Sequence, residues 1–283
     1  MFQKRGSRIQ LFLSRCNFFP KNSKGQLTIF IVVGVLIVSG VALFFLYNSN
    51  ILPEIGGRTE TNPNLFLRTC IEDKMKEGLN LISLNGGKLN NPASIRFKFA
   101  DEDQYHNISY LCYTPLNYVP CINQNPLLIK SVEEEIKDYI KTDFEDCFDG
   151  MISNFDKQGF ETSTEGLKGF EVKMHPKKIA VETDSEVTLT KTGETTTQKN
   201  LGMEMPSRIY EILNTVQEIS NQEAEFCNFD SNGFMIVYPE FNIKKTNEGG
   251  KGNIYAVGHR ETGEKFRFAT RSCVMLPGLL PDE

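Results

Sequence analysis

Cysteine is the residue type in this chain whose number and placement point most directly to chemistry. Of seven cysteines, Cys16 precedes a long apolar run and the others follow it. An even set of cysteines without a C-x-x-C spacing favours disulfides over a zinc site. The sequence therefore predicts disulfide pairing in an oxidising compartment, and buried free thiols are the alternative. The cysteines after the run are Cys70, Cys112, Cys121, Cys147, Cys227 and Cys273.

Acid–base and metal chemistry have weaker candidates. The acidic run 101–103 with His106 could bind a cation or transfer a proton, but we interpret it as a solvated hairpin tip. The segment from Asn228 through Asp230 is similar to a calcium-binding loop, yet its twelfth position is Pro239, where such loops carry glutamate. We therefore interpret that segment as a turn.

Motifs of established enzyme classes do not occur in the chain. It has no G-x-S-x-G elbow, phosphate-binding P-loop, H-E-x-x-H helix or G-x-G-x-x-G turn, and its histidines (His106, His175 and His259) are scattered. We therefore predict no catalytic residue, no cofactor and no metal ligand. A hydrolase with a site of another kind is an alternative, and a free cysteine with His259 is one candidate pair for it.

One modification motif lies on the part of the chain after the apolar run. Asn107-Ile108-Ser109 matches the N-x-S sequon for N-glycosylation. A sequon next to a predicted hairpin turn is accessible to a glycosylating enzyme in an extracytoplasmic protein. Asn107 is therefore a candidate glycosylation site.

The apolar run itself predicts a transmembrane helix over residues 26–47. Residues 27–46 contain no charged side chain. At about 1.5 Å per residue such a helix spans roughly 30 Å, which matches the hydrocarbon thickness of a bilayer. A buried helix of a soluble protein is the alternative, but such helices rarely run uncharged for about twenty residues.

The flanks of the run predict its orientation. Residues 1–25 carry basic side chains and no acidic one, so this tail is expected in the cytoplasm and residues 48–283 outside. Acidic residues outnumber basic ones in the chain by 36 to 31, and the excess is larger once the basic tail is set aside. We expect no nucleic-acid partner, because binding of that kind needs an exposed basic surface.

Two predicted helices position one pair of cysteines. Apolar residues at helical spacing predict a helix over 63–84 that carries Cys70 and ends before Gly86. A second helix is expected to begin with a capping box of Ser131 and Glu134 and to carry Cys147 on its apolar face. Both cysteines then face a shared core, so we pair Cys70 with Cys147.

The other pairs follow from loop position and from what is left. Cys112 and Cys121 flank a loop that contains Pro115 and Pro120, so a bridge between them would close it locally. This leaves Cys227 with Cys273. Each bridge is expected to contribute about 2–4 kcal/mol by restricting the unfolded chain.

Alternating segments and a third helix complete a predicted α+β fold with antiparallel sheets. Residues 95–99 and 108–113 are expected to form a hairpin, and residues 170–190 an antiparallel meander. A helix should start at Pro206, and short strands should follow. The expected strands are 234–238, 254–257 and 266–268.

The predicted organisation has five parts. A basic cytoplasmic tail (1–25) and the transmembrane helix (26–47) precede a linker (48–64) rich in Asn, Pro, Gly and Thr. A helix-hairpin-helix subdomain (65–155) and a strand-helix-strand subdomain (165–283) form the ectodomain. The fold class is thus an N-terminal transmembrane helix followed by a disulfide-braced ectodomain with about three helices.

The apolar run begins at the segment Lys24-Gly25-Gln26-Leu27-Thr28-Ile29-Phe30. This segment resembles the anchor of a group of uncharacterised archaeal single-pass membrane proteins. In that group a helix ending in Gly-Gly and a second cysteine-bearing helix follow the anchor, and Gly86-Gly87 and the 133–147 segment match those features. The resemblance implies an envelope location and no particular activity.

The same edge also resembles, more weakly, the class III signal of archaeal type IV pilin-like proteins. That resemblance implies cleavage by a prepilin peptidase between Gly25 and Gln26. The chain departs from the pilin pattern at Phe30, where many pilins carry glutamate, and at Pro53, which interrupts the helical stem. Processing of the anchor is therefore an alternative to a permanent signal-anchor.

Together these observations predict a membrane-anchored extracytoplasmic envelope protein with a binding or assembly role. The expected partners are the lipid bilayer, through residues 26–47, and a protein partner or a second copy of the chain. A pilin-like subunit processed after Gly25 and an ectoenzyme of the hydrolase type are the alternatives.

Overall fold

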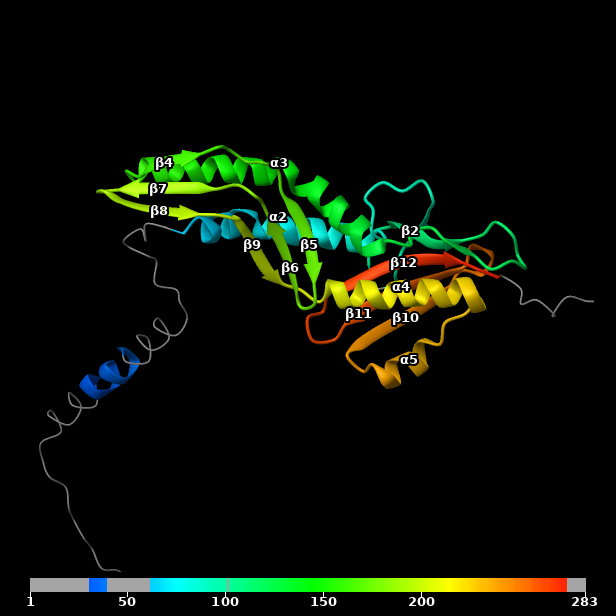
Figure 1. The fold of residues 1–283 in the computed structure, drawn as a ribbon. Coiled ribbons are helices and arrows are strands. Elements are labelled where there is room, and N and C mark those ends of the chain that lie inside the picture. Colours follow the sequence, from blue (N-terminus) through cyan, green and yellow to red (C-terminus); the bar gives the residue numbers. More distant parts are fainter. Residues whose placement is uncertain (1–30, 40–61, 101, 274–283) are drawn as a thin grey trace, which may run out of the picture. The chain divides into compact units, whose positions relative to one another are not determined.

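The computed structural model describes residues 31–39, 62–100 and 102–273 (Figure 1). Residues 31–39 are helical and fall within the predicted membrane segment 26–47. Among the described residues no helix is both long and apolar enough to span a bilayer. The rest of that segment, the tail 1–25 with the Gly25-Gln26 edge, and most of the linker 48–64 lie outside the described residues.

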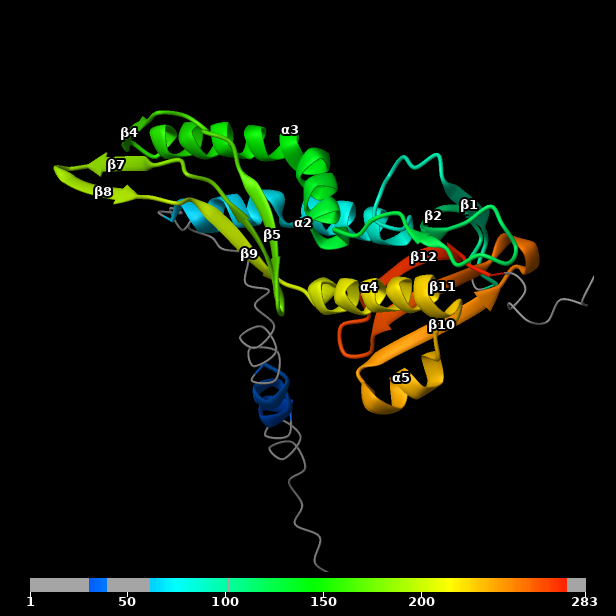
Figure 2. The same cartoon turned by 45° about the vertical axis from the view of Figure 1, so that its right-hand side comes forward.

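Two long helices form the first layer of the part of the chain that begins at residue 62. Helix α2 (Pro63–Leu84) starts where the side chain of Asn62 accepts hydrogen bonds from the N–H groups of Asn64 and Leu65. It ends before Gly86 and Gly87, whose φ angles of +78° and +89° suit glycine. Helix α3 (Leu128–Lys157) packs along α2 (Figure 2).

The start of α3 differs from the prediction. The helix begins before Ser131, whose N–H already donates to the carbonyl of Leu127, so the capping box of Ser131 and Glu134 does not form. The apolar face that starts at Leu128 extends the helix backward by burying that residue in the core. The helix also continues beyond Cys147 to Lys157.

The main sheet contains strands from both predicted subdomains. Its order is β1 (Ser94–Phe97), β2 (His106–Tyr113), β12 (Lys265–Arg271), β11 (Asn253–His259) and β10 (Phe241–Asn247), with β3 (Ile122–Asn123) paired to β2. Neighbours are antiparallel except β2 and β12, which are parallel. Because β2 and β12 pair directly, the expected subdomains 65–155 and 165–283 share one sheet.

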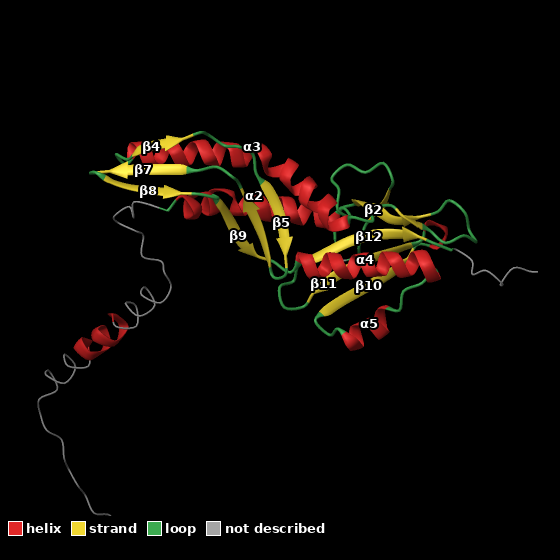
Figure 3. Cartoon of the chain, viewed as in Figure 1, coloured by secondary structure: helices red, strands yellow, loops and turns green. Residues whose placement is uncertain are grey.

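Two smaller antiparallel sheets replace the predicted single meander (Figure 3). One contains β4 (Glu161–Thr164), β7 (Val187–Lys191) and β8 (Glu194–Gln198), and the other β5 (Glu171–His175), β6 (Lys178–Glu182) and β9 (Gly202–Pro206). Between β6 and β7 the hydroxyl of Thr183 donates to the carbonyl of Gly169, and Ser185 Oγ accepts from the N–H of Lys168. These side-chain hydrogen bonds direct the chain out of the sheet that contains β6, so β7 pairs with β4 and not with β6.

Two further expectations were wrong near the C-terminal half. Helix α4 (Ile209–Phe226) begins after Pro206, which ends β9 instead. The predicted strand 234–238 is the short helix α5 (Ser231–Val237), because the carboxylate of Asp230 accepts from the N–H groups of Asn232 and Gly233 and starts a helical turn.

One large apolar core joins these elements. It includes the inner faces of α2, α3 and α4 and the strand residues directed toward them, such as Tyr255, Phe266 and Phe268, none of which is exposed to solvent. A small second cluster lies on the opposite face of the main sheet. Its buried members are Ile95, Ile108, Tyr110, Ile254 and Ala269.

Three disulfides fasten the layers. Cys70–Cys147 joins α2 to α3, Cys112–Cys121 closes the loop after β2, and Cys227–Cys273 joins the end of α4 to the chain after β12. The pairing is the one indicated by the helical faces and the loop positions. The α+β class is as predicted, with α5 as an additional helix.

Candidate functional site

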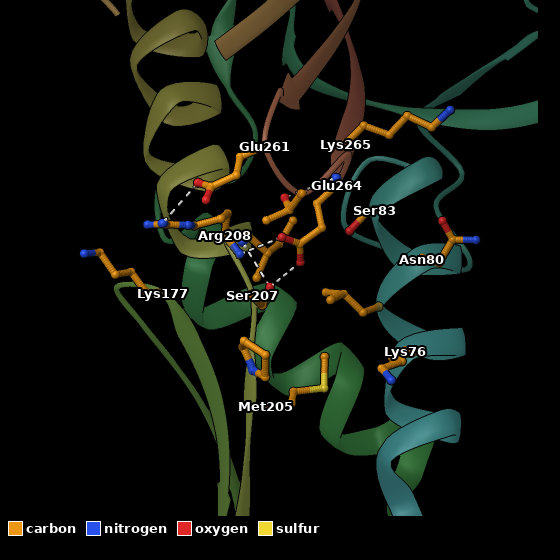
Figure 4. A pocket seen from close by; sticks show the side chains of 14 residues that line it. Lys76, Asn80, Ser83, Lys177, Met205, Ser207, Arg208, Glu261, Glu264 and Lys265 are labelled. Atoms are coloured by element: carbon orange, nitrogen blue, oxygen red, sulfur yellow. Dashed lines mark hydrogen bonds and ion pairs between the residues drawn. The ribbon is translucent and has the colours of Figure 1, made fainter. Parts of the chain in front are cut away.

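A hollow of the folded domain lies between α2, the junction of β9 with α4, and the turn from β11 to β12 (Figure 4). Its volume is about 620 Å³, which is the size of many small-molecule sites. Segments far apart in the sequence meet here, so the hollow exists only in the folded chain. We refer to it as the α2–α4 cavity.

The floor of the α2–α4 cavity is apolar. Leu79, Met205 and Ile209 line it, and their exposed fractions are 7%, 3% and 1%. Leu79 belongs to the core face of α2, Met205 points inward from β9, and Ile209 opens the apolar stripe of α4. The cavity is thus an opening at the edge of the main core, where an apolar group would be removed from water.

The rim of the cavity is rich in cations. Lys76 forms an ion pair with Glu72 at 2.7 Å on the outer side of α2, and Arg208 forms pairs with Glu211 at 3.3 Å and Glu261 at 3.4 Å. Further positive charge comes from other elements. The remaining cationic lining residues are Lys177 and Lys265.

A serine–carboxylate pair lies at the centre of the cavity wall (Figure 4). The hydroxyl of Ser207 donates to Glu264, which also accepts from the N–H of Arg208 at 2.7 Å. Ser207 Oγ in turn accepts from the N–H of Ile209 at 3.1 Å. Both side chains therefore satisfy N–H groups at the start of α4, so the pair acts as a helix cap.

Ser83 provides an uncommitted polar group. It lies in the last turn of α2, is 2% exposed, and points toward the cavity (Figure 4). Within the described ranges its hydroxyl has no hydrogen-bond partner. A buried hydroxyl without a partner is costly, and a polar atom of a bound ligand would satisfy it.

The predicted acidic cluster has a structural use that the sequence did not indicate. Glu102 lies 3.0 Å from Nε2 of His106 and forms an ion pair with the buried Arg267, so the hairpin tip is tied to β12 and is not simply solvated. The hydrogen bond from Arg267 lowers the pKa of Glu102 below its ordinary value. Asp101 lies outside the described residues.

The other histidines and the calcium-like segment do not form a site with one another. His175 ends β5, and the buried ring of His259 lies edge-on to Phe241 at 5.9 Å. Asp230 caps α5. Across the described ranges no group of three or more Cys, His, Asp or Glu side chains is placed to hold a metal ion.

The cysteine and asparagine candidates also have defined places. All six cysteines after the apolar run are in disulfides, so none supplies the free thiolate that a pair with His259 would need. Asn107 is exposed near the start of β2, opposite Arg96 on β1. Its side chain is accessible, as a glycosylation site requires.

A buried polar network under α4 was missed by the sequence reasoning. Glu223 is fully buried; it accepts from the hydroxyl of Tyr255 and pairs with Lys245 at 3.3 Å. Burial, followed by the charge of Glu223, raises the pKa of Tyr255. A sequence signal existed, because Glu223 continues the apolar stripe of Val216 and Ile219 at helical spacing. The network ties α4 to β10 and β11.

Comparison with known proteins gives no indication of function. The chain matches no protein-family model, no curated protein and no solved structure.

Proposed function

We propose that the chain is a membrane-anchored extracytoplasmic protein whose folded domain binds an amphipathic anion in the α2–α4 cavity. The observation that carries this proposal is the combination of an apolar floor with a cationic rim. Apolar surface removed from water contributes about 25 cal/mol per Å², and the rim favours a negatively charged end group. The free hydroxyl of Ser83 adds one polar contact.

Binding, more than catalysis, suits the polar groups of this cavity. Ser207 is engaged as both donor and acceptor at the start of α4, and Glu264 accepts two hydrogen bonds there. A group that holds a helix terminus is costly to redirect toward a substrate. The lysines of the rim, in contrast, extend from the outer part of α2, from the turn between β5 and β6, and from the first residue of β12, where they can meet a ligand.

The location rests on sequence features and on the disulfides. The uncharged run 27–46 with its basic flank supports a membrane anchor with the folded domain outside. Three disulfides suit an oxidising compartment.

Calorimetric titration of the full chain in detergent tests the cavity. Octanoate is the probe, with octanol as its uncharged counterpart, in the micelles used for the protein and with a micelle-only blank. We expect octanoate to bind more tightly than octanol, and Lys76→Gln to weaken octanoate binding about threefold to tenfold, as expected for one lost charge contact.

The matched control is Lys74→Gln, which removes a lysine from the same helix outside the cavity. Equal binding of octanoate and octanol, or equal effects of the two lysine variants, would show that the rim does not recognise charge. Absence of binding by either probe would refute the cavity as the ligand site.

The second candidate, a pilin-like subunit, is favoured by the Lys24-Gly25-Gln26 edge. Mass spectrometry of the mature protein separates it from the permanent anchor. A chain that begins at Gln26 supports processing, whereas a chain that retains residues 1–25 supports the anchor. Protease treatment of sealed cells or vesicles tests the orientation, because an outward domain is digested without lysis.

A further inference from the structure

We propose that the main sheet carries a second binding site, specific for oxyanions such as phosphate or carboxylate groups. The site is a hollow of about 460 Å³ on β10, β11 and β12. It shares only Glu264 and Lys265 with the α2–α4 cavity. We call it the sheet hollow.

Strand register places the lining residues on one face of the sheet. Lys244, Ala256 and Arg267 form one row across β10, β11 and β12. Asn242, Gly258 and Lys265 form the next row. Since side chains alternate along a strand, this face is opposite to the one that carries Tyr255 and Val257 into the core.

A fixed positive charge lies at one wall of the hollow. Arg267 is only 3% exposed, and its guanidinium donates to Glu102, with one of the bonds at 3.0 Å. It lies 4.0 Å from the centre of the Phe99 ring. In the described structure its Nε–H has no acceptor, so a donor is held in place and left unused.

Exposed positive charges surround this buried one. Lys244, Arg260 and Lys265 line the hollow and are exposed. Over the described ranges the ammonium group of Lys244 has no carboxylate within ion-pair distance, and Lys265 approaches Glu102 only to 3.8 Å. The charge-assisted hydrogen bonds that an oxyanion accepts are therefore available from several directions.

The nearby acids do not cancel this charge. Glu264 accepts from the Ser207 hydroxyl and the Arg208 N–H, and Glu102 is taken by Arg267. The whole chain has a formal net charge of −5, so a local surplus of cations is not a property of its composition. Their convergence on one face favours an anionic ligand.

Small residues keep the floor open. Ala256 and Gly258 are partly exposed between the two cationic sides. A Cβ atom at Gly258 would lie 3.5 Å from the Glu264 carbonyl oxygen, an ordinary contact, so the backbone does not require glycine there. Its absence of a side chain instead leaves room above the strand for a ligand.

Titration of the full chain in neutral detergent at low ionic strength tests the sheet hollow. The probes are inorganic phosphate and succinate, and sodium chloride at matched ionic strength is the reference. We expect at least one probe to release or absorb heat with a saturable isotherm, which sodium chloride does not give. Binding of phosphate alone or of succinate alone supports the site and identifies which oxyanion it prefers.

Two variants and one control locate the binding. Lys244→Gln should weaken it about threefold to tenfold, as expected for one charge-assisted hydrogen bond. Gly258→Leu should abolish it by filling the floor. Lys178→Gln removes the same charge from the β5–β6–β9 sheet, where Lys178 is paired with Glu204, and should leave the affinity unchanged.

Specific outcomes would overturn the proposal. These are a lack of saturable binding for both probes, or an equal loss of affinity in Lys244→Gln and Lys178→Gln. Lys244→Gln changes an exposed side chain, so its result stands even if Gly258→Leu fails to fold. Lys76 lines only the α2–α4 cavity and Lys244 only the sheet hollow, so the two lysine variants report on the two sites separately. Failure of one site therefore does not imply failure of the other.

Discussion

The two faces of the main sheet use neighbouring lysines in opposite ways. Lys245 points toward the core face, where it reaches the fully buried Glu223 and lies beneath α4. Lys244, one residue earlier, lies on the other face and lines the sheet hollow. The core face is covered by helices, whereas this part of the opposite face is not (Figure 2).

This difference between the two faces distinguishes charged groups that stabilise the fold from charged groups that are free to meet a ligand. Under α4, one carboxylate oxygen of the buried Glu223 accepts from Tyr255 and pairs with Lys245, so its charge is compensated inside the protein. On the opposite face, Glu102 satisfies Arg267 in part, and the remaining cations stay exposed. Structural groups are paired internally, and the unpaired donors indicate where a ligand would bind.

The largest expected effect concerns the attachment of α4 to the core face. Replacing Cys227 and Cys273 by alanine removes a bridge across 46 residues and should cost about 4 kcal/mol in the chain-entropy treatment. The bridge Cys112–Cys121 spans only 9 residues, so its removal should cost about 3 kcal/mol. Urea denaturation of both double variants measures the difference, and the reverse order would contradict this account.

The neighbouring lysines give the most direct test of the comparison. Lys245→Met leaves the carboxylate of Glu223 buried without its cation and should cost about 3 kcal/mol of unfolding free energy. Lys244→Met should change it by less than about 0.5 kcal/mol, as is usual for an exposed site. Similar losses in both variants, measured by urea denaturation, would mean that the two faces are not distinct.

Two glycines, Gly252 just before β11 and Gly258 within it, should also respond differently. Gly252 has a φ of +97°, and an added Cβ would collide with the carbonyl oxygen of Thr270. Gly252→Ala should therefore cost about 2 kcal/mol. Gly258→Ala should stay within about 0.5 kcal/mol of the parent, because its Cβ meets only ordinary contacts. Thermal unfolding of the two variants would contradict this if Gly258→Ala were the less stable.

The smallest expected effect is a pH dependence of the unfolding free energy, which comes from Glu102 beside the sheet hollow. The pKa of Glu102 is lowered by Arg267, so its ionised form stabilises the fold above the ordinary carboxyl pKa of about 4.3. That contribution is lost as the pH falls through the lowered pKa of the folded state. Glu102→Gln should be less stable than the parent at pH 7, and the gap should narrow in acid.

Denaturation curves at pH 7, 4.5 and 3 measure that gap. Glu165→Gln is a suitable control, because Glu165 pairs with Lys168 at the surface and not with a buried cation. A gap between Glu102→Gln and the parent that stays constant over this range would show that Glu102 does not contribute through its charge.

Local patterns predicted those parts of the fold that depend on neighbours in sequence. Helix α2 matches its prediction at both ends, because the Asn62 cap, Pro63 and the glycines after Leu84 lie within a few residues of the helix. The cysteine pairs were predictable because two of the cysteines lie on helical faces and two flank a short loop. Residues of the cavity and the hollow gave no such signal, since they come from separate elements.

Local patterns failed where side chains or distant strands compete with propensity. The apolar segment 234–238 alternates too little to distinguish strand from helix, and the carboxylate of Asp230 decides for helix α5. The buried hydroxyls of Thr183 and Ser185 divide one meander into two sheets. The parallel pairing of β2 with β12 joins residues more than a hundred positions apart, and no local pattern encodes it.

The sequence by itself determined the α+β class, the sorting of cysteines around the apolar run, and the helices that carry Cys70 and Cys147. These depend on periodicity and composition, which are properties of short segments. Only the tertiary structure decided that Lys245 is half-buried and Lys244 exposed, and that cations from two strands and a turn converge over Gly258. The reason is that burial depends on which elements cover a face, and that is settled by contacts between distant parts of the chain.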